Sequence, residues 1–547
     1  MARTIASLHQ ILRVPCILLL LSFTITTSTE ATTNKNPTAE TVIQCLETNS
    51  NASQDIFSAI YTPENTSYTT VLETYIRNLR YNTSTTRKPL FILTALHESH
   101  VQAAVLCARK HGLEMKIRSG GHDYEGISYW SIVPFFILDM FNFRNISVDP
   151  ETATAWVQAG ATLGEVYYNV ANKTDNKYGF PAGVCPTVGV GGHLSGGGYG
   201  NMMRKYGLTV DNIIDAVLVD VNGRILNRSS MGEDLFWAIT GGGAASFGVV
   251  LSYRINVVPV PGTVTVFSVK RTLEQNASEI VNRWQYVAPI IDDDLFIRMT
   301  LDVVNSTTSS SNLTGRATFL ALYLGNSSSL LSLMGKSFPE LGLAQSDCTE
   351  MTWLESVLFW TNFPTGTPTT ALLSRIPQVL THLKRKSDYV RTQIPEDGLN
   401  GMWKKLIELK SVALTFNPYG GKMAEVPASA TPFPHRAGVL WKFQYATNWA
   451  QDGTEVSNLY LNLTNELHTY MTPFVTKNPR EAFLNYRDLD LGINHNGKKS
   501  FSEGKVYGIM YFKENFDRLV RVKTMVDPGN FFRNEQSIPT LPLGRKI

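Results

Sequence analysis

The chain has 547 residues, of which 43% are hydrophobic and 17% charged, and its formal net charge is +3. This composition is that of a globular protein and excludes extensive disorder, and the length allows two or three structural units. No dense run of Lys or Arg occurs, so the charge pattern predicts no nucleic-acid binding.

Residues 1–31 have the pattern of a secretory signal peptide. Arg3 and Arg13 precede the apolar stretch 14–25, and small and polar residues follow. The apolar run is shorter than the roughly 20 residues that a spanning helix needs. The sequence therefore predicts a protein of the secretory pathway, with no membrane anchor once the signal is removed.

Asn-X-Ser/Thr sequons are dense behind this segment. Their number, eleven, predicts a glycoprotein of the secretory route. They begin at Asn51, Asn65, Asn82, Asn145, Asn172, Asn227, Asn276, Asn305, Asn312, Asn326 and Asn462.

The segment from about 85 to 260 predicts an α+β domain. Residues 90–93 form a short apolar run, 97–111 have helical spacing with Gly112 as the stop, and 115–118 alternate as a strand. Residues 213–226 predict two strands around the turn Asn222-Gly223.

A second α+β domain is predicted after Pro-Val-Pro-Gly at 259–262. Residues 317–324 and 439–445 alternate as strands, and 456–470 have the apolar spacing of an amphipathic helix. We expect a sheet with one helix-covered face. The Ser/Thr/Asn-rich patch 305–314 predicts an exposed loop.

Three glycine-rich loops fall in the first domain, at 119–122, 183–200 and 241–248. Glycines at this density let backbone N–H groups approach a ligand closely and form anion-binding nests. The second loop also carries Cys185, His193 and Tyr199, which a flexible linker would not need. Together the loops predict a phosphate-rich cofactor.

Five motifs resemble those of one family. They are Arg-Ser-Gly-Gly-His-Asp-Tyr-Glu-Gly at 118–126, the segment around Cys185, Asp-Leu-Phe-Trp at 234–237, Pro-Tyr-Gly-Gly-Lys-Met at 418–423 and Phe-Phe-Arg-Asn-Glu-Gln-Ser-Ile at 531–538. The chain resembles the berberine bridge enzyme-like family of plant FAD-linked oxidoreductases, which includes the cannabinoid-acid synthases. The resemblance covers essentially the whole mature chain.

The resemblance implies an α+β fold with a two-part FAD-binding domain of the vanillyl-alcohol-oxidase type. We expect the FAD-binding domain at 32–262 with its core at about 85–260, and a substrate domain at 263–478 with an antiparallel sheet covered by helices. The segment 479–547 would return to the FAD domain. The protein would be a monomer of the cell wall or the vacuole.

Bicovalent FAD is the cofactor that the resemblance implies. His122 matches the histidine bonded to the flavin 8α carbon, and Cys185 matches the cysteine bonded to flavin C6. Cys45 and Cys107 match the family's disulfide, which leaves Cys348 unpaired. The other expected cofactor positions are Ser119, Gly120, Gly121, Val188, Gly191, Gly192, His193 and Gly198.

Four positions are candidates for the chemistry. Glu425 matches the general base of berberine bridge enzyme, the alternative being a glutamate that pairs locally. Tyr199 and Gln444 match residues that bracket the flavin ring. Phe483 departs from relatives whose tyrosine acts as the base in cannabinoid-acid synthases, and Thr240 stands where relatives often have arginine. No metal site is predicted.

The expected activity is that of an FAD-dependent oxidase. It would take a hydride from a benzylic, allylic or prenyl carbon of a phenolic or prenylated substrate, and O2 would reoxidise the flavin to give H2O2. Val188 matches a family gate position where valine accompanies oxidase behaviour.

Two other reactions fit the same fold. Some mulberry members are Diels–Alderases, and pericyclic chemistry needs positioning rather than a base, as Phe483 would allow. A carbohydrate oxidase also fits the family, although it would need a base-equipped pocket. A binding protein without turnover would leave the two flavin anchors without a purpose.

Overall fold

The structure, a computed structural model, describes residues 38–50, 55–306, 312–497 and 499–542. Pro37–Ile547 form one compact unit. The expected signal peptide and the sequon at Asn51 lie outside the described residues, as does the middle of the patch 305–314. Within the described ranges, no helix combines the length and the apolar character needed to cross a bilayer.

A four-stranded sheet forms the N-terminal part of this unit. Its order is β1-β2-β4-β3, with β2, β4 and β3 parallel and β1 antiparallel to β2. Its strands are β1 Ile60–Tyr61, β2 Ile92–Thr94, β3 Glu114–Arg118 and β4 Phe135–Asp139. Helix α3 (Glu98–His111) connects β2 to β3 as the sequence predicted, and it ends at Gly112, whose φ of +69° favours glycine.

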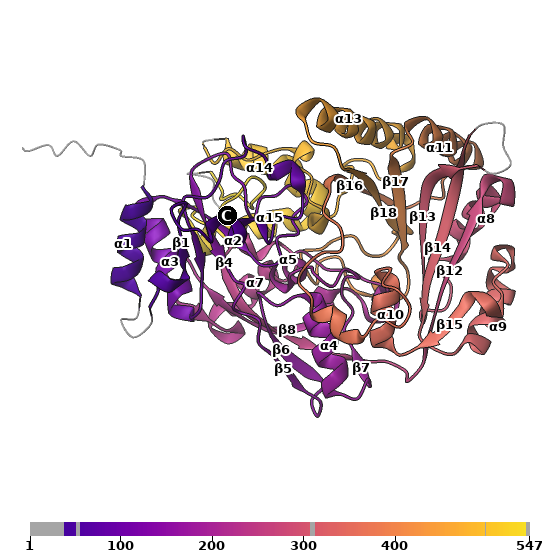
Figure 1. Cartoon of the computed structure of the whole chain (residues 1–547), viewed down its shortest axis with the longest axis horizontal. Coiled ribbons are helices and arrows are strands. Elements are labelled where there is room, and N and C mark those ends of the chain that lie inside the picture. Colours follow the sequence, from indigo (N-terminus) through magenta and orange to yellow (C-terminus); the bar gives the residue numbers. More distant parts are fainter. Residues whose placement is uncertain (1–37, 51–54, 307–311, 498, 543–547) are drawn as a thin grey trace, which may run out of the picture. The chain divides into compact units, whose positions relative to one another are not determined.

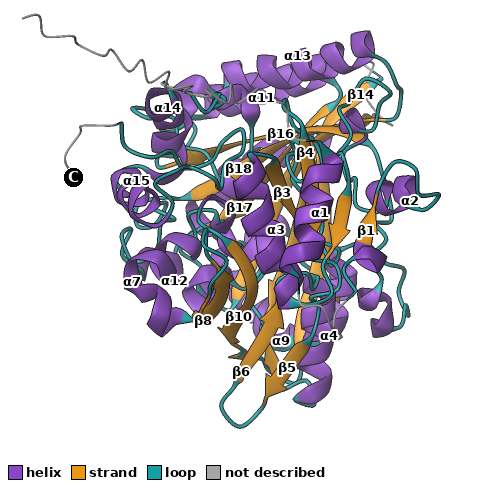
Figure 2. Cartoon of the chain, turned by 90° about the vertical axis from the view of Figure 1, so that its left-hand side faces the viewer, coloured by secondary structure: helices purple, strands orange, loops and turns teal. Residues whose placement is uncertain are grey.

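Helix α1 (Ala39–Asn49) lies beside α3 (Figure 2). A disulfide between Cys45 and Cys107 joins the two helices, and its Cα atoms are 5.6 Å apart. The expected pairing is therefore confirmed. Cys348 is a free thiol of intermediate exposure at the start of β15 (Cys348–Met351).

The second sheet is five-stranded and antiparallel, in the order β5-β6-β10-β8-β9. Its strands are β5 Ile146–Asp149, β6 Thr154–Gln158, β8 Ile213–Val219, β9 Ile225–Leu226 and β10 Val249–Asn256; β7 (Tyr178–Gly179) and β11 (Val258–Pro259) form a separate pair. Strands β8 and β9 are the expected pair around Asn222-Gly223. Helix α4 (Leu163–Lys173) begins with a capping box between Thr162 and Glu165.

The third sheet has seven antiparallel strands in the order β15-β12-β14-β13-β17-β18-β16. The strands besides β15 are β12 Val264–Thr272, β13 Leu295–Asn305, β14 Leu313–Tyr323, β16 His382–Val390, β17 Val412–Pro418 and β18 Trp441–Trp449. Helices α8 (Ala277–Val287), α11 (Glu396–Leu409) and α13 (Thr454–Tyr470) contact these strands (Figure 1). The α+β fold and the helix-covered antiparallel sheet that the sequence predicted are confirmed.

The two faces of this sheet differ in character. Along β13, Ile297 and Met299 are buried in a core that includes residues of all three helices, whereas Arg298 and Thr300 between them are partly exposed. Side chains alternate between the faces of a strand, so one face carries the core and the other carries polar side chains. The polar face is the one that contributes to the site.

The C-terminal segment returns to the first part of the chain (Figure 1). Helix α15 (Asn515–Val526) follows α14 (Ser500–Phe512) and contacts α7 (Arg228–Ile239). Beyond it, Glu535 forms a buried ion pair of 2.6 Å with Lys116 of β3. The domain limits at 262 and 478 stay a prediction. The remaining α-helices are α2 Tyr68–Glu73, α5 Val190–Ser195, α6 Met203–Tyr206, α9 Ser327–Ser337, α10 Trp353–Trp360 and α12 Lys422–Glu425.

Candidate functional site

A cavity of about 420 Å³ lies between the glycine-rich loops and the polar face of the seven-stranded sheet. Its walls come from 117–124, 183–199, 244–250 and 483–486, together with side chains of β13, β17 and β18. Of the expected positions, Ser119, Gly120, Gly121, His122, Cys185, Val188, Gly191, Gly192, His193, Tyr199, Gln444 and Phe483 line it. The structure thus brings together residues that are more than 300 positions apart in the chain.

The two candidate flavin anchors meet at one hydroxyl group. The His122 Nε2 is 2.9 Å from the Thr187 Oγ1, and the Cys185 Sγ is 3.5 Å from the same oxygen. Burial, with the nearby charge of Arg77, lowers the pKa of His122 to about 3. Its imidazole is therefore neutral at ordinary pH and retains the lone pair that bonding to a carbon atom requires.

The glycine loops pack backbone against backbone around the anchors. A Cβ on Gly120 would lie 2.4 Å from the Gly189 N, and one on Gly189 would lie 2.2 Å from the Gly120 N. A Cβ on Gly192 would instead meet nothing within 4 Å. Side chains at the first two positions would separate the loops, whereas Gly192 leaves a peptide accessible from the cavity, as a close-fitting cofactor requires.

His193 and Gly198 hold these loops in place. The Gly183 N–H donates to the His193 Nε2 at 3.0 Å, and the Gly198 N–H donates to the Asn485 Oδ1 at 3.0 Å. Gly198 itself does not line the cavity, and its φ of +66° explains the glycine. The chain's residues fit a flavin: apolar walls, glycine backbones and two nucleophilic side chains lie on one cavity.

Aromatic and polar side chains make another wall of the cavity. Tyr124, Tyr199, Phe483 and Tyr486 line it, and the Gln444 Nε2 donates to the Tyr124 hydroxyl at 3.1 Å. Tyr199 and Tyr486 hydrogen-bond to each other through their hydroxyls.

Lys442 lies beneath this wall and was missed by the sequence analysis. Its Nζ is 3.3 Å from the ring centre of Tyr199, 3.9 Å from that of Phe483 and 4.3 Å from that of Tyr486. This nitrogen is buried without a hydrogen-bond partner among the described residues. Burial, with the charge of Arg298, lowers the pKa of Lys442 well below its usual range.

The alternation of strand β18 could have revealed Lys442. Residues two apart on a strand point to the same face, so the prediction that placed Gln444 in the pocket also places Lys442 on that side. A buried lysine is rare unless it is paired or functional, which makes this position informative.

Glu425 lies outside the cavity. It belongs to the short helix α12, its side chain is 62% exposed, and it forms an ion pair of 2.9 Å with Lys422. A general base must come within hydrogen-bond reach of the proton it removes. The structure therefore favours the local-pairing interpretation, and we assign no base role to Glu425.

Phe483 and Thr240, which differ from the residues expected from the family, have structural roles. Phe483 is buried, with its ring edge-on to those of Tyr199 and Phe433, so it adds apolar packing and no proton-accepting group. Thr240 is buried at the end of α7, where its hydroxyl donates to the Phe236 carbonyl at 2.9 Å.

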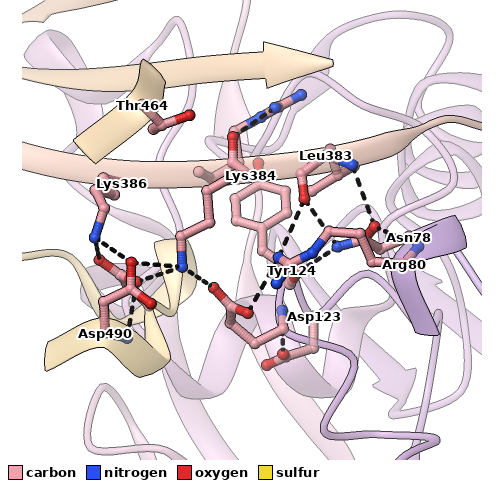
Figure 3. Close-up of polar contacts among 12 residues, drawn as sticks. Asn78, Arg80, Asp123, Tyr124, Leu383, Lys384, Lys386, Thr464 and Asp490 are labelled. Carbon is pink, nitrogen blue, oxygen red and sulfur yellow. Dashed lines mark hydrogen bonds and ion pairs between the residues drawn. The ribbon is translucent and has the colours of Figure 1, made fainter. Parts of the chain in front are cut away.

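An ion cluster lies beside the cavity residues Asp123 and Tyr124 (Figure 3). Lys384 of β16 contacts Glu125 at 2.5 Å, Asp488 at 2.7 Å and Asp490 at 3.2 Å. Lys386 contacts Asp488 at 2.8 Å and Asp490 at 2.6 Å. Burial opposes the charged form, but the charges of Asp488 and Glu125 hold the pKa of Lys384 above its usual range.

The cluster joins three distant segments. Glu125 follows the Asp123 and Tyr124 of the cavity wall, and Asp488 follows Tyr486 of the same wall. The Arg487 Nε donates to the Asp123 Oδ2 at 2.9 Å, which makes a further bond between these segments. The cluster thus sets the position of the His122 loop relative to Tyr486 and to the sheet.

Comparison with known proteins gives consistent matches along the chain. A family model described as an FAD binding domain matches residues 89–229, and one described as berberine and berberine like matches 482–539. Berberine bridge enzyme-like 8 of Arabidopsis thaliana is 59% identical over 508 residues, 92% of this chain and 95% of that protein. Berberine bridge enzyme-like 1 of the same plant is 54% identical over 97% of this chain and 99% of that protein.

Solved structures agree with these matches. The structure of BBE-like #28 from Arabidopsis thaliana has a TM-score of 0.85 and 44% identity, and covers 92% of this chain and 100% of that one. Phl p 4, described as a grass pollen allergen with glucose dehydrogenase activity, has a TM-score of 0.85 and 41% identity over the same shares of the two chains.

Proposed function

The chain belongs to the berberine bridge enzyme-like family of FAD-linked oxidoreductases, and from this membership we propose that it is an oxidase of small phenolic or prenylated molecules. The observation that carries the proposal is the cavity wall on which the Tyr199 and Tyr486 hydroxyls meet above the buried Lys442. This wall supplies proton-accepting groups although Phe483 replaces the family tyrosine.

His122 and Cys185 hold the cofactor in this proposal, each by one covalent bond. When bound, FAD supplies the acceptor for a hydride from the substrate carbon. Two such bonds would hold the flavin in the cavity that Tyr199 and Gln444 also line, so these side chains would be placed to orient a substrate next to it.

The Tyr199–Lys442 pair accepts the proton of the substrate hydroxyl in this proposal. The lowered pKa of Lys442 favours the neutral amine, which is the form that can accept a proton. In that form Lys442 gains one proton while the hydride leaves the substrate: the Tyr199 oxygen relays the proton from the substrate hydroxyl, and Tyr199 stays a neutral phenol. Tyr486 donates to or accepts from that oxygen, and Gln444 and Tyr124 orient the substrate.

Oxygen is the proposed final electron acceptor, reduced to H2O2. Val188 lines the cavity and is the residue that we propose as its gate. For Phl p 4, wild-type protein is described as a glucose dehydrogenase, and a variant with a single isoleucine-to-valine substitution is described as a glucose oxidase. This relative supports the idea that a valine at such a position goes with oxidase behaviour.

A carbohydrate oxidase is the second candidate, because relatives 41–42% identical to this chain are described as glucose dehydrogenases or oxidases. The polar residues Thr415 and Gln444 on the cavity side of the sheet could bind sugar hydroxyls. Anaerobic mixing with phenolic compounds and with sugars separates the two candidates.

The test is anaerobic mixing of the purified flavoprotein with a panel of phenolic compounds, prenylated phenols and reducing sugars. An oxidase loses its flavin absorbance near 450 nm in about one turnover with a true substrate and regains it in air with formation of H2O2. Bleaching by sugars alone would favour the carbohydrate alternative. Product formed over many anaerobic turnovers without bleaching would overturn the oxidase and support a Diels–Alderase.

The cofactor bonds are tested separately by acid precipitation. The unmodified protein should stay yellow in the pellet, and His122→Ala and Cys185→Ala should each retain flavin through the remaining bond. The double variant should release flavin to the supernatant. Release from the unmodified protein would contradict both bonds.

A further inference from the structure

Arg298 is the one Lys or Arg among the described residues that line the cavity. It projects from the polar face of β13, at the end of the cavity where Thr415 and Gln444 also lie. No step of the proposed oxidation uses it. Its surroundings show what it can bind.

The guanidinium of Arg298 is held in place and left open on one side. Its Nε donates to the Asn417 Oδ1 at 2.8 Å, and its Cζ lies 5.1 Å from the ring centre of Trp360. The bond to Asn417 is the one side-chain hydrogen bond that Arg298 makes among the described residues, and none of the ion pairs among those residues includes Arg298. The two Nη atoms are therefore free to donate into the cavity.

The other cations near the cavity have partners or a lowered pKa. Arg77 donates to the Thr74 and Arg375 carbonyls. Arg385 donates to the Lys384 and Thr447 carbonyls. Arg487 is paired with Asp123, and Lys384 and Lys386 are paired with carboxylates of the ion cluster. Lys442 has a low pKa, partly because of Arg298 itself. Arg298 thus gives this end of the cavity a positive charge that no described side chain neutralises.

We propose that Arg298 binds a carboxylate, or an equivalent oxyanion, of the substrate through its two Nη atoms. This inference rests on the proposed function only for the location of the substrate. A guanidinium fixed by a bond at Nε and by an aromatic ring presents its Nη edge with little loss of side-chain freedom, which suits bidentate binding of a planar anion. The substrate class becomes that of acids: a phenolic acid or a sugar acid.

Equilibrium binding tests the proposal without turnover. Changes in the visible flavin spectrum would be titrated with two matched pairs of probes, benzoate with benzamide and glucuronate with glucose. In the unmodified holoprotein, at least one acid should bind about tenfold or more tightly than its neutral partner, the usual scale for a charge-assisted hydrogen bond. Preference in one pair only would support the proposal and identify the source of the anion.

Variants at Arg298 assign the preference to this side chain. Arg298→Gln should bring the acid and its neutral partner within about twofold of each other while the neutral probe keeps its affinity. Arg298→Lys should retain part of the preference, because it keeps the charge but loses the planar fork. Flavin content and the melting temperature of each variant check that the cavity is intact.

Two outcomes overturn the proposal. One is an unmodified protein that shows no preference for either acid, and the other is a preference that survives in Arg298→Gln. Either result would leave the oxidase proposal standing, since flavin bleaching by a neutral substrate is independent of it. Conversely, acid preference without bleaching by any compound would support the anion site and contradict the oxidase.

Discussion

Two groups of cations lie on one seven-stranded sheet and differ in their partners. Lys384 of β16 contacts three carboxylates and Lys386 contacts two (Figure 3). Lys442 of β18 and Arg298 of β13 contact no carboxylate among the described residues. All four come from the same antiparallel sheet. The comparison separates charges that hold segments together from charges that are free to act on a ligand.

The difference follows from the cost of burying charge. A buried lysine loses its hydration, so it must either be paired or lose its proton. Lys384 is paired with carboxylates, and its pKa is raised. Lys442 is unpaired, and its lowered pKa favours the neutral amine. A buried amine that has lost its proton can accept one, which a paired ammonium cannot. Substitutions in the two groups should therefore have opposite effects on stability and on activity.

The largest effect is expected from Lys384→Met. The substitution leaves Glu125 and Asp488 buried with fewer counter-charges, and breaking a buried pair in this way costs about 3–5 kcal/mol of unfolding free energy. Urea unfolding followed by circular dichroism measures it. Because the cluster positions the His122 loop, we also expect a smaller fraction of covalently bound flavin.

Lys422→Met is the matched control. Its ammonium pairs with Glu425 on the surface, where the two side chains are 46% and 62% exposed. Water and salt screen such an exposed pair, so the unfolding free energy should hardly change. An equal loss in both variants would show that burial of the ion cluster adds nothing to stability.

Lys442→Met should slow the reaction without lowering the unfolding free energy. The amine is already without polar partners and lies under three rings, so methionine of similar length should keep or raise the unfolding free energy. Removing the proton-accepting pair should slow anaerobic flavin bleaching about 10²-fold or more. Stopped-flow absorbance with a substrate from the panel measures the rate.

Glu425→Gln is the control for that rate. Glu425 lies outside the cavity, so its substitution should leave bleaching within about twofold of the unmodified rate. A 10²-fold loss in Glu425→Gln, together with an unchanged rate in Lys442→Met, would contradict the assignment of the proton acceptor.

Acid titration should sharpen the comparison for the paired group. Burial raises the pKa of Asp490, but the charges of Lys384 and Lys386 outweigh it and lower the pKa from 3.8 to about 2. A lowered folded-state pKa stabilises the fold above the unfolded value, and this contribution is lost as pH falls from about 4 towards 2.

Asp490→Asn isolates that contribution. Its unfolding free energy should be below that of the unmodified protein at pH 6, and the two should converge near pH 2. Urea unfolding at intervals between pH 6 and 2 gives both curves. Parallel curves over the whole range would contradict the pairing of Asp490 with the two lysines.

Sequence reasoning predicted the local features well and the long-range ones unevenly. Helix α3 with its glycine stop, the β8–β9 pair and the helix-covered sheet follow from periodicity and turn residues close together in the chain. His122, Cys185, Tyr199 and Gln444 were expected from motifs, and the structure places them on one cavity.

The misses have a common physical cause. The ion cluster depends on which charges meet across segments such as 125, 384–386 and 488–490, and no local pattern encodes that meeting. Strand alternation could place Lys442 on the cavity side of the sheet, but it could not show that the amine lacks a partner. The base role expected for Glu425 depends on tertiary structure in the same way, because a motif position does not show whether the short helix α12 turns its carboxylate towards the cavity.

The smallest effect is expected from Phe483→Tyr. The ring lies edge-on to Tyr199, and its centre is 3.9 Å from the Lys442 Nζ, so the new hydroxyl would join a wall that already has three tyrosine hydroxyls. If Tyr199 and Lys442 accept the proton, the added group is redundant, and bleaching should change by less than about threefold. Stopped-flow absorbance after anaerobic mixing with a substrate measures the rate. A rise of tenfold or more would mean that position 483 holds the missing base and that the unpaired Lys442 serves it rather than Tyr199.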